Sequence, residues 1–194
     1  DIFGKHTTFL CTADAEGNWV ALNQTINTGF GSKVIIPGTG VLLNNEMDDF
    51  AVQPGVPNAF KLVGAEANAI APGKRPLSSM TPTIVLKDGQ LFLVTGSPGG
   101  PTIINTVLQI VSNVIDFGMS ATQAVEAPRI HHQWMPDSLS YERNGLNTDT
   151  ATILKSLGHS FKERNSYEGS YQGDGETIMV DPKTRLRLGA ADPR

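Results

Sequence analysis

The chain has 194 residues, of which 39% are hydrophobic and 18% charged, which excludes a disordered chain and predicts one domain with a sizeable core. The formal net charge of −4 excludes a surface built to bind a nucleic-acid backbone. A single cysteine, Cys11, excludes an internal disulfide and a four-cysteine zinc site. No apolar run approaches the roughly 20 residues that span a bilayer.

An antiparallel hairpin is predicted at the start of the chain. Residues 7–13 and 19–28 are rich in β-branched and aliphatic side chains, and turn-forming residues at 14–18 separate them. Thr7 opens the first strand and Thr25 lies late in the second. In an antiparallel pair these two positions can be neighbours across the ladder.

A carboxylate cluster and a long loop follow the hairpin. Residues 40–50 pass from an apolar strand into the acidic group Glu46, Asp48 and Asp49. Residues 54–76 are rich in proline and glycine and are typical of a long irregular loop. Loops of that length are uncommon in compact domains and are often functional lids.

Hairpins and helices alternate in the second half of the chain. Apolar runs joined by turn residues predict two hairpins, and helical spacing or capping residues predict three helices. The predicted hairpins span residues 83–95 and 177–188. The predicted helices span residues 102–117, 120–127 and 149–157, with Ser120 and Asp149 as the N-caps of the second and third. These elements predict an α+β fold with antiparallel sheets, or a layered α/β fold.

A threonine and a glycine turn are candidates for chemistry. The hydroxyl of Thr7 is a weak nucleophile unless a base lies beside it, and a free terminal amine, with a pKa of about 7.7–8.0, would supply one. The alternative is that Thr7 only fills a strand. Gly99 and Gly100 lie between a strand and a helix, where N–H groups can bind an anion or a developing oxyanion. An ordinary turn is the alternative, and the missing GK[ST] ending disfavours a phosphate loop.

Other polar residues have similarly divided interpretations. The carboxylates of residues 46–49 can bind a cation or an ammonium group, or simply be solvated. Ser78 and Ser79 fit a small polar pocket or ordinary capping. His131 and His132 are adjacent, and neighbours on a strand face opposite ways, so we expect structural roles rather than one shared metal.

Seven motifs of one family occur in order along nearly the whole chain. They are Thr7-Thr8, Thr25–Thr28, Asn44–Phe50, Lys74–Met80, Thr95–Gly100, Ala127–Arg129 and Asp192–Arg194. With them the chain resembles the small, catalytic subunit of the γ-glutamyltranspeptidases, which are N-terminal-nucleophile hydrolases. The resemblance implies a four-layer αββα sandwich with mostly antiparallel sheets, completed by a large subunit that this chain does not contain.

The resemblance also implies how the protein is made and what it contacts. Family members are made as one precursor that cleaves itself before a threonine. Residues 1–6 would then be a segment upstream of the cleavage point, and residues 7–194 would be a single catalytic domain. The implied partner is the large subunit of the same precursor, in an obligate heterodimer. A periplasmic or extracellular location is implied, whereas a metal, an organic cofactor or a nucleic-acid partner is not.

The implied reaction moves a γ-glutamyl group from glutathione or a related amide to an amino acid, a dipeptide or water. Matched motif by motif, Thr7 is implied as the nucleophile and Thr25 as the residue that hydrogen-bonds it. The oxyanion hole would be the N–H groups of Gly99 and Gly100. The implied substrate-binding residues are Asn27, Glu46 and Asp49 for the α-amino group, and Ser78 and Ser79 for the α-carboxylate.

The sequence departs from the family pattern at two points. While residues 1–6 remain attached, Thr7 has no free amine, and we expect no transferase activity. Residues 54–60 match the family's lid loop, in which some members carry tyrosine where this chain has Phe60. A phenylalanine can cover the pocket but cannot donate a hydrogen bond to Asn27, so we expect a looser gate and a larger share of hydrolysis. An equal transfer-to-hydrolysis ratio in Phe60→Tyr would contradict this.

Two other functions stay open at this stage. One is a β-lactam side-chain acylase of the glutaryl-cephalosporin type on the same scaffold, which turnover of γ-glutamyl and glutaryl anilides would distinguish. The other is a non-catalytic module that binds γ-glutamyl compounds with Thr7 unprocessed. Intact-mass measurement addresses that possibility, because maturation removes everything before Thr7.

Overall fold

The computed structural model describes residues 7–164 and 171–194, so the segment predicted to precede cleavage, residues 1–6, lies outside the described residues. The strands are β1 (Thr7–Ala13), β2 (Trp19–Thr25), β3 (Thr83–Lys87), β4 (Gln90–Gly96), β5 (Ile130–His131), β6 (Leu139–Tyr141), β7 (Phe161–Glu163), β8 (Glu176–Val180) and β9 (Arg187–Ala190). The α-helices are α1 (Thr102–Ile115), α2 (Ala121–Glu126) and α3 (Thr148–Ser156). Two short 3-10 helices are η1 (Glu46–Asp49) and η2 (Glu66–Asn68).

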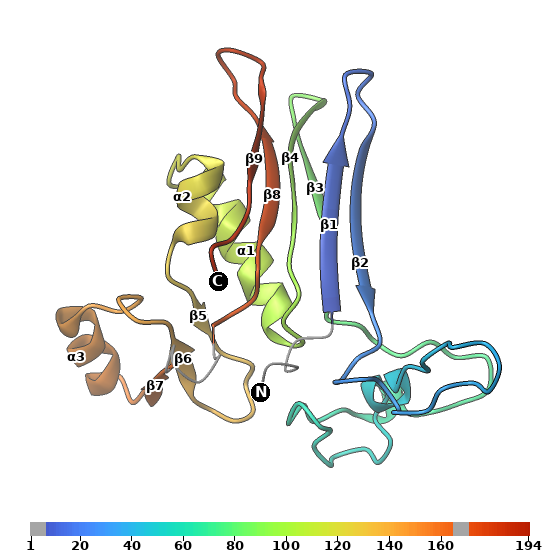
Figure 1. Cartoon of the computed structure of the whole chain (residues 1–194). Coiled ribbons are helices and arrows are strands. Elements are labelled where there is room, and N and C mark those ends of the chain that lie inside the picture. The colour runs from blue at the N-terminus through green and yellow to red at the C-terminus, as the bar shows by residue number, and fades with distance from the viewer. Residues whose placement is uncertain (1–6, 165–170) are drawn as a thin grey trace.

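The described residues form three layers. The hairpin β1–β2 packs against β4 and β8 of an antiparallel sheet with the order β3-β4-β8-β9. Helices α1 and α2 pack on that sheet through β4, β8 and β9 (Figure 1). A smaller sheet, β5-β6-β7, lies with α3 to one side, and its β6–β7 pair is parallel. The predicted α+β architecture with mostly antiparallel sheets is therefore confirmed.

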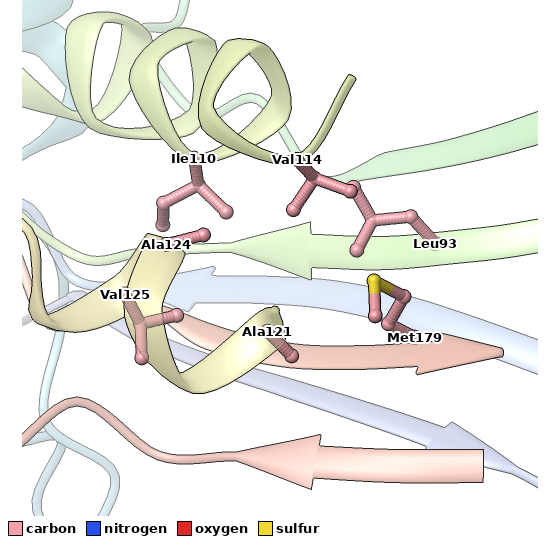
Figure 2. Close-up of a cluster of buried hydrophobic side chains, with 7 residues drawn as sticks. All are labelled: Leu93, Ile110, Val114, Ala121, Ala124, Val125 and Met179. Atoms are coloured by element: carbon pink, nitrogen blue, oxygen red, sulfur yellow. The ribbon is translucent and has the colours of Figure 1, made fainter. Parts of the chain in front are cut away.

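The central strand β4 is covered on both faces. Leu93 and Val94 are neighbours in β4, and both are fully buried. Because successive side chains on a strand point to opposite faces, one of them must face the helices and the other the hairpin. Figure 2 shows the helix side, where one cluster holds Leu93, Met179 of β8, and residues of the two helices: Ile110 and Val114 of α1, and Ala121, Ala124 and Val125 of α2. Burial of these side chains locks α1 in place, and α1 begins at one end of the cavity described below.

The hairpin and helices predicted from pattern agree with the structure except at their ends. The helix expected over 102–117 ends at Ile115. Ser120 caps α2 in a reciprocal capping box, as predicted. For α3 the cap is Asn147, whose side chain accepts from Thr150 N–H, rather than the predicted Asp149. Asn147 lies just ahead of the helix with an extended backbone, whereas Asp149 already belongs to its first turn.

Loops gather at one end of the layers. The start of β1, the end of β2 and the start of α1 point towards the segment of residues 26–82, which holds η1 and η2 but little other regular structure (Figure 1). This segment is tied together by backbone and side-chain hydrogen bonds, among them Asn68 Nδ2 to Asp49 O at 2.8 Å. Within the described part of the chain, no helix is long and apolar enough to cross a membrane.

Candidate active site

Thr7 begins β1, and the register of the hairpin places Thr25 directly opposite it. The Thr7 hydroxyl donates a hydrogen bond to Thr25 Oγ1 over 3.0 Å. Thr25 Oγ1 also accepts from the backbone N–H of Asn27 at 2.8 Å. Asn27 has φ of +74°, so the chain turns away there and β2 ends at Thr25 instead of the predicted Thr28. The predicted pairing of the two threonines across the hairpin is confirmed, and a single hydroxyl holds Thr7 in orientation.

The turn before α1 presents two glycine N–H groups. Gly99 and Gly100 have φ of +140° and +58°, values that residues other than glycine rarely adopt. The Gly99 carbonyl accepts from Thr102 N–H at 3.2 Å and from Thr102 Oγ1 at 2.9 Å. Because N–H and C=O of one trans peptide point in opposite directions, the Gly100 N–H points away from the first turn of α1. Neither glycine N–H donates to any residue within 7–164 or 171–194, so both can serve an oxyanion.

The same turn is fixed from behind by buried hydrogen bonds. Ser97 is fully buried, and its hydroxyl donates to Pro98 O at 2.6 Å and accepts from Asp174 N–H at 2.9 Å. Asn23 of β2 donates through Nδ2 to Ser97 O at 3.0 Å. The hairpin that carries the threonines is therefore linked directly to the loop that carries the glycines, which fixes their relative position.

Two carboxylates of η1 lie side by side without a cation. Burial, followed by the neighbouring Asp49 carboxyl, raises the pKa of Glu46 to about 7, and burial raises the pKa of Asp49 as well. Glu46 Oε1 is buried and has no hydrogen-bond partner. No lysine or arginine among the described residues forms an ion pair with either group. A buried carboxylate oxygen without a hydrogen-bond partner is a candidate to bind a ligand, and an ammonium group can donate a hydrogen bond to it.

These groups line one cavity of about 760 Å³. Of the predicted site residues, all but Gly99 contribute to its wall, namely Thr7, Thr25, Asn27, Glu46, Asp49, Phe60, Ser78, Ser79 and Gly100. Positions up to 93 residues apart in the sequence are thus brought to one place. The cavity wall thus holds a hydroxyl that can act as a nucleophile, an N–H that can bind an anion, two carboxyl groups and a pair of serine hydroxyls. The space between them is large enough for a small peptide.

Phe60 closes one side of this cavity. A Cβ added at Gly100 would lie 3.2 Å from the Phe60 ring, so the ring packs directly on the glycine turn. Asp48, which the sequence grouped with the other acidic residues, instead holds the lid loop. Its Oδ2 accepts from Ala59 N–H at 3.2 Å, and its carbonyl accepts from Asn58 Nδ2 at 3.2 Å. Residues 54–60 are therefore held against the cavity, with the Phe60 ring on the glycine turn.

Three further residues in the wall were missed by the sequence reasoning. Asn105 of α1, His131 of β5 and Gln133 all line the cavity, and hydrogen bonds join them in series. The expected opposite orientation of the two histidines is confirmed, since His131 is buried and His132 pairs with the exposed Asp137. In the sequence, strand alternation indicates only that one of two adjacent histidines faces inward. No motif marks Asn105 and Gln133 as the hydrogen-bond partners of His131.

The described residues contain no group of three or more His, Cys, Asp or Glu side chains placed to hold a metal ion. The lone Cys11 lies half-buried on β1, where burial and then the charge of Glu176 raise the pKa of its thiol to about 11. A thiol with such a pKa stays protonated near neutral pH and is a poor nucleophile. Cys11 is therefore a poor candidate for a nucleophile.

Known proteins resemble the chain in both sequence and structure. The sequence pattern of the γ-glutamyltranspeptidase family matches residues 3–194. A glutathione hydrolase proenzyme of Escherichia coli is 50% identical over 190 residues, which are 98% of this chain and 32% of that protein. The chain thus spans about a third of that relative's length.

Solved structures agree with the sequence match. A mutant γ-glutamyltranspeptidase of Helicobacter pylori superposes with a TM-score of 0.89 at 49% identity, covering 96% of this chain and 98% of that one. A cephalosporin acylase of Bacillus halodurans gives a TM-score of 0.80 at 30% identity, covering 95% of this chain and 32% of that one. These neighbours confirm the predicted α+β fold of the N-terminal-nucleophile hydrolases. The chain belongs to the γ-glutamyltranspeptidase family.

Proposed function

We propose that this chain is the catalytic part of a larger enzyme that moves the γ-glutamyl group of glutathione, or of a related amide, to an amino acid, a dipeptide or water. One observation carries the proposal: a single cavity wall holds a paired threonine hydroxyl, an unpaired glycine N–H and two carboxylates without a cation among the described residues. They match, in turn, the carbonyl carbon, the carbonyl oxygen and the α-ammonium group of a γ-glutamyl amide. Family membership supports the same reaction.

In the proposed reaction, Thr7 Oγ1 attacks the γ-amide carbon while its proton passes to the α-amine of the same residue. The carbonyl π pair moves to oxygen, where the N–H groups of Gly99 and Gly100 stabilise it by about 3–4 kcal/mol each. Collapse of this intermediate breaks the C–N bond, and the departing amine takes the proton from the Thr7 amine. The γ-glutamyl ester that remains is attacked by an acceptor amine or by water, which restores the hydroxyl.

The rest of the cavity would recognise the glutamyl head group. Glu46, Asp49 and the side-chain amide of Asn27 would receive the α-ammonium group, and the raised pKa values of the two carboxyls would fall on binding. The hydroxyls of Ser78 and Ser79 would donate to the α-carboxylate. Head-group recognition at both ends would fix the γ-carbon beside Thr7.

Maturation would use the same hydroxyl. Thr7 Oγ1 would attack the carbonyl carbon of the preceding residue, His6, which lies outside the described residues. The peptide bond would become an ester, and water would then hydrolyse it to leave a free Thr7 amine. This amine is the base that the transfer reaction requires.

A large subunit from the same precursor is the proposed partner. The chain spans only 32% of the Escherichia coli proenzyme, and one face of the hairpin is apolar and uncovered within the described residues. Leu10, Val20 and Leu22 lie on that face, and Leu10 is opposite Leu22 in the register. A helical layer from the partner would cover them and complete the four-layer sandwich. The family resemblance supports a periplasmic or extracellular location for the assembled enzyme.

The complete precursor provides the test. Thr7→Ala should leave the precursor uncut and lower turnover of γ-glutamyl-p-nitroanilide by about 10³-fold or more. Thr122→Ala is the matched control, because Thr122 is exposed on α2 and away from both the cavity and the apolar face of the hairpin. Intact mass reads cleavage and released nitroaniline reads turnover. Full cleavage and activity in Thr7→Ala would refute the proposal.

The acylase alternative is tested with the same enzyme. A glutaryl group lacks the α-ammonium that Glu46 and Asp49 would bind, so both carboxyls would stay unpaired against it. We therefore expect γ-glutamyl-p-nitroanilide to be turned over with a much higher kcat/KM than glutaryl-p-nitroanilide. The reverse preference would favour the acylase.

A further inference from the structure

A row of hydrogen-bonded side chains connects α1 to the lid loop. Asn105 Oδ1 lies 2.8 Å from His131 Nδ1, and His131 Nε2 lies 2.9 Å from Gln133 Oε1. Gln133 Nε2 then donates to the carbonyl oxygen of Phe60 at 3.2 Å. The row runs through the cavity wall from a core helix to the residue that covers the glycine turn.

The orientation of Gln133 is fixed by its partners. Its Nε2 donates to two carbonyls, those of Phe60 and Met135, the latter at 2.9 Å. An amide oxygen in that place would face two acceptors, so Oε1 must face the histidine. His131 Nε2 therefore carries the hydrogen and donates to Gln133, and Nδ1 of the neutral ring must accept, so the Asn105 amide is assigned with its Nδ2 towards His131. Because His131 is 6% exposed, this bond is shielded from water and holds Gln133 in one rotamer.

The contact to the lid uses backbone instead of a side chain. Phe60 has no hydroxyl, but its carbonyl is held by Gln133, and the next residue back, Ala59, is held by Asp48. The two anchors come from different segments, since Gln133 follows β5 and Asp48 belongs to η1. Between them the Phe60 ring is pressed on Gly100.

We propose that His131 and Gln133 are positioning residues that latch the Phe60 carbonyl and so keep the lid loop closed over the γ-glutamyl site. The inference rests on the proposed function for its consequence, which is retention of the donor during transfer. It modifies the expectation of a looser gate from the missing hydroxyl, because the closed position has an anchor that does not depend on the side chain at position 60. Neither residue contacts the reacting atoms in this proposal.

The test removes the hydrogen-bond donor of the Gln133 side chain and keeps its hydrogen-bond acceptor. In Gln133→Glu the carboxylate can still accept from His131, but it cannot donate to Phe60 O and repels it. In the complete enzyme we expect amide hydrogen exchange in residues 54–62 to rise about tenfold, with no change in residues 103–111 of α1. We expect KM for γ-glutamyl-p-nitroanilide to rise several-fold while kcat changes less than twofold.

Two further variants keep the test decisive. Gln123→Glu makes the same chemical change at the exposed cap of α2, outside the cavity, and should leave exchange and KM unchanged. Gln133→Met, which keeps the length without charge, should reproduce the lid exchange if Gln133→Glu folds poorly. Unchanged exchange over 54–62 in both Gln133 variants, or an equal rise throughout the chain, would overturn the latch. Exchange does not require turnover, so an enzyme inactive on γ-glutamyl amides would refute the proposed function separately.

Discussion

Two pairs of carboxylates in this chain differ in whether cationic side chains pair with them. Asp192 and Glu142 are both buried, and each meets a guanidinium. Asp192 bonds Arg129 at 2.6 Å and Arg194 at 2.6 Å, and Glu142 bonds Arg194 at 2.8 Å. Burial alone would raise the pKa of Asp192, but the N–H of Gly175 and the Arg129 charge outweigh burial and the pKa is lowered.

Glu46 and Asp49 are half-buried beside one another, and no guanidinium or ammonium group of the described residues pairs with them. The pKa values of both carboxyls are raised, and Glu46 Oε1 has no partner. The first pair is therefore part of the folded framework, whereas the second pair is available for the cationic ligand proposed above. The two pairs differ both in how deeply they are buried and in whether a guanidinium meets them, and the Gly175 N–H together with the guanidinium lowers the pKa of Asp192 despite its burial.

Removing the charge of Asp192 should have the largest effect. Asp192→Asn would leave the Arg129 guanidinium, which is 1% exposed, without its carboxylate, and this should cost about 3–5 kcal/mol of unfolding free energy. Denaturant unfolding of the complete enzyme measures it. Asp137→Asn is the control, since Asp137 is exposed and its carboxylate pairs with His132 alone among the described residues, and we expect a change below about 1 kcal/mol. An equal loss in both variants would mean that the first pair is not structural.

Asp49→Asn should leave the fold intact and weaken the ligand instead. Loss of a charged hydrogen bond to the α-ammonium should cost about 1.5–3 kcal/mol of binding, which appears as a rise in KM for the γ-glutamyl donor. Glu66→Gln is the control, because Glu66 is an exposed carboxylate in η2 and does not line the cavity. An unchanged KM in Asp49→Asn would contradict the α-ammonium assignment.

The fold was largely predictable because its strands and helices carry local signals. The hairpin β1–β2 has turn residues between apolar runs, so the pairing of Thr7 with Thr25 followed from counting along an antiparallel ladder. The α1 helix followed from apolar spacing. The short strands β5 and β6 have no such signal, since two or three residues are too few to show a period.

The candidate site was predictable only where a motif carried it. Glu46 and Asp49 came with the resemblance, because a pattern of acidic residues alone favoured plain solvation. The sequence placed Asp48 with them, although the structure turns it to the lid loop. Gln133 and Asn105 were missed because their roles depend on which carbonyl or imidazole the fold brings near, and no spacing in the sequence encodes those contacts.

The smallest expected effect is the pH dependence of donor binding. The pKa of Glu46 is raised to about 7 by burial and by Asp49, so below that pH the Glu46 carboxyl is mostly protonated in the enzyme without ligand. An ammonium ligand favours the ionised carboxyl, and binding must then release a proton. From pH 6 to 7.5, where the ammonium remains charged, KM should fall about tenfold.

In Glu46→Gln no proton remains to be released at that position, and the fall should be largely lost. Measuring the ratio of the two KM values at each pH cancels titration of the Thr7 amine, so parallel profiles would show that Glu46 does not take part in ammonium binding.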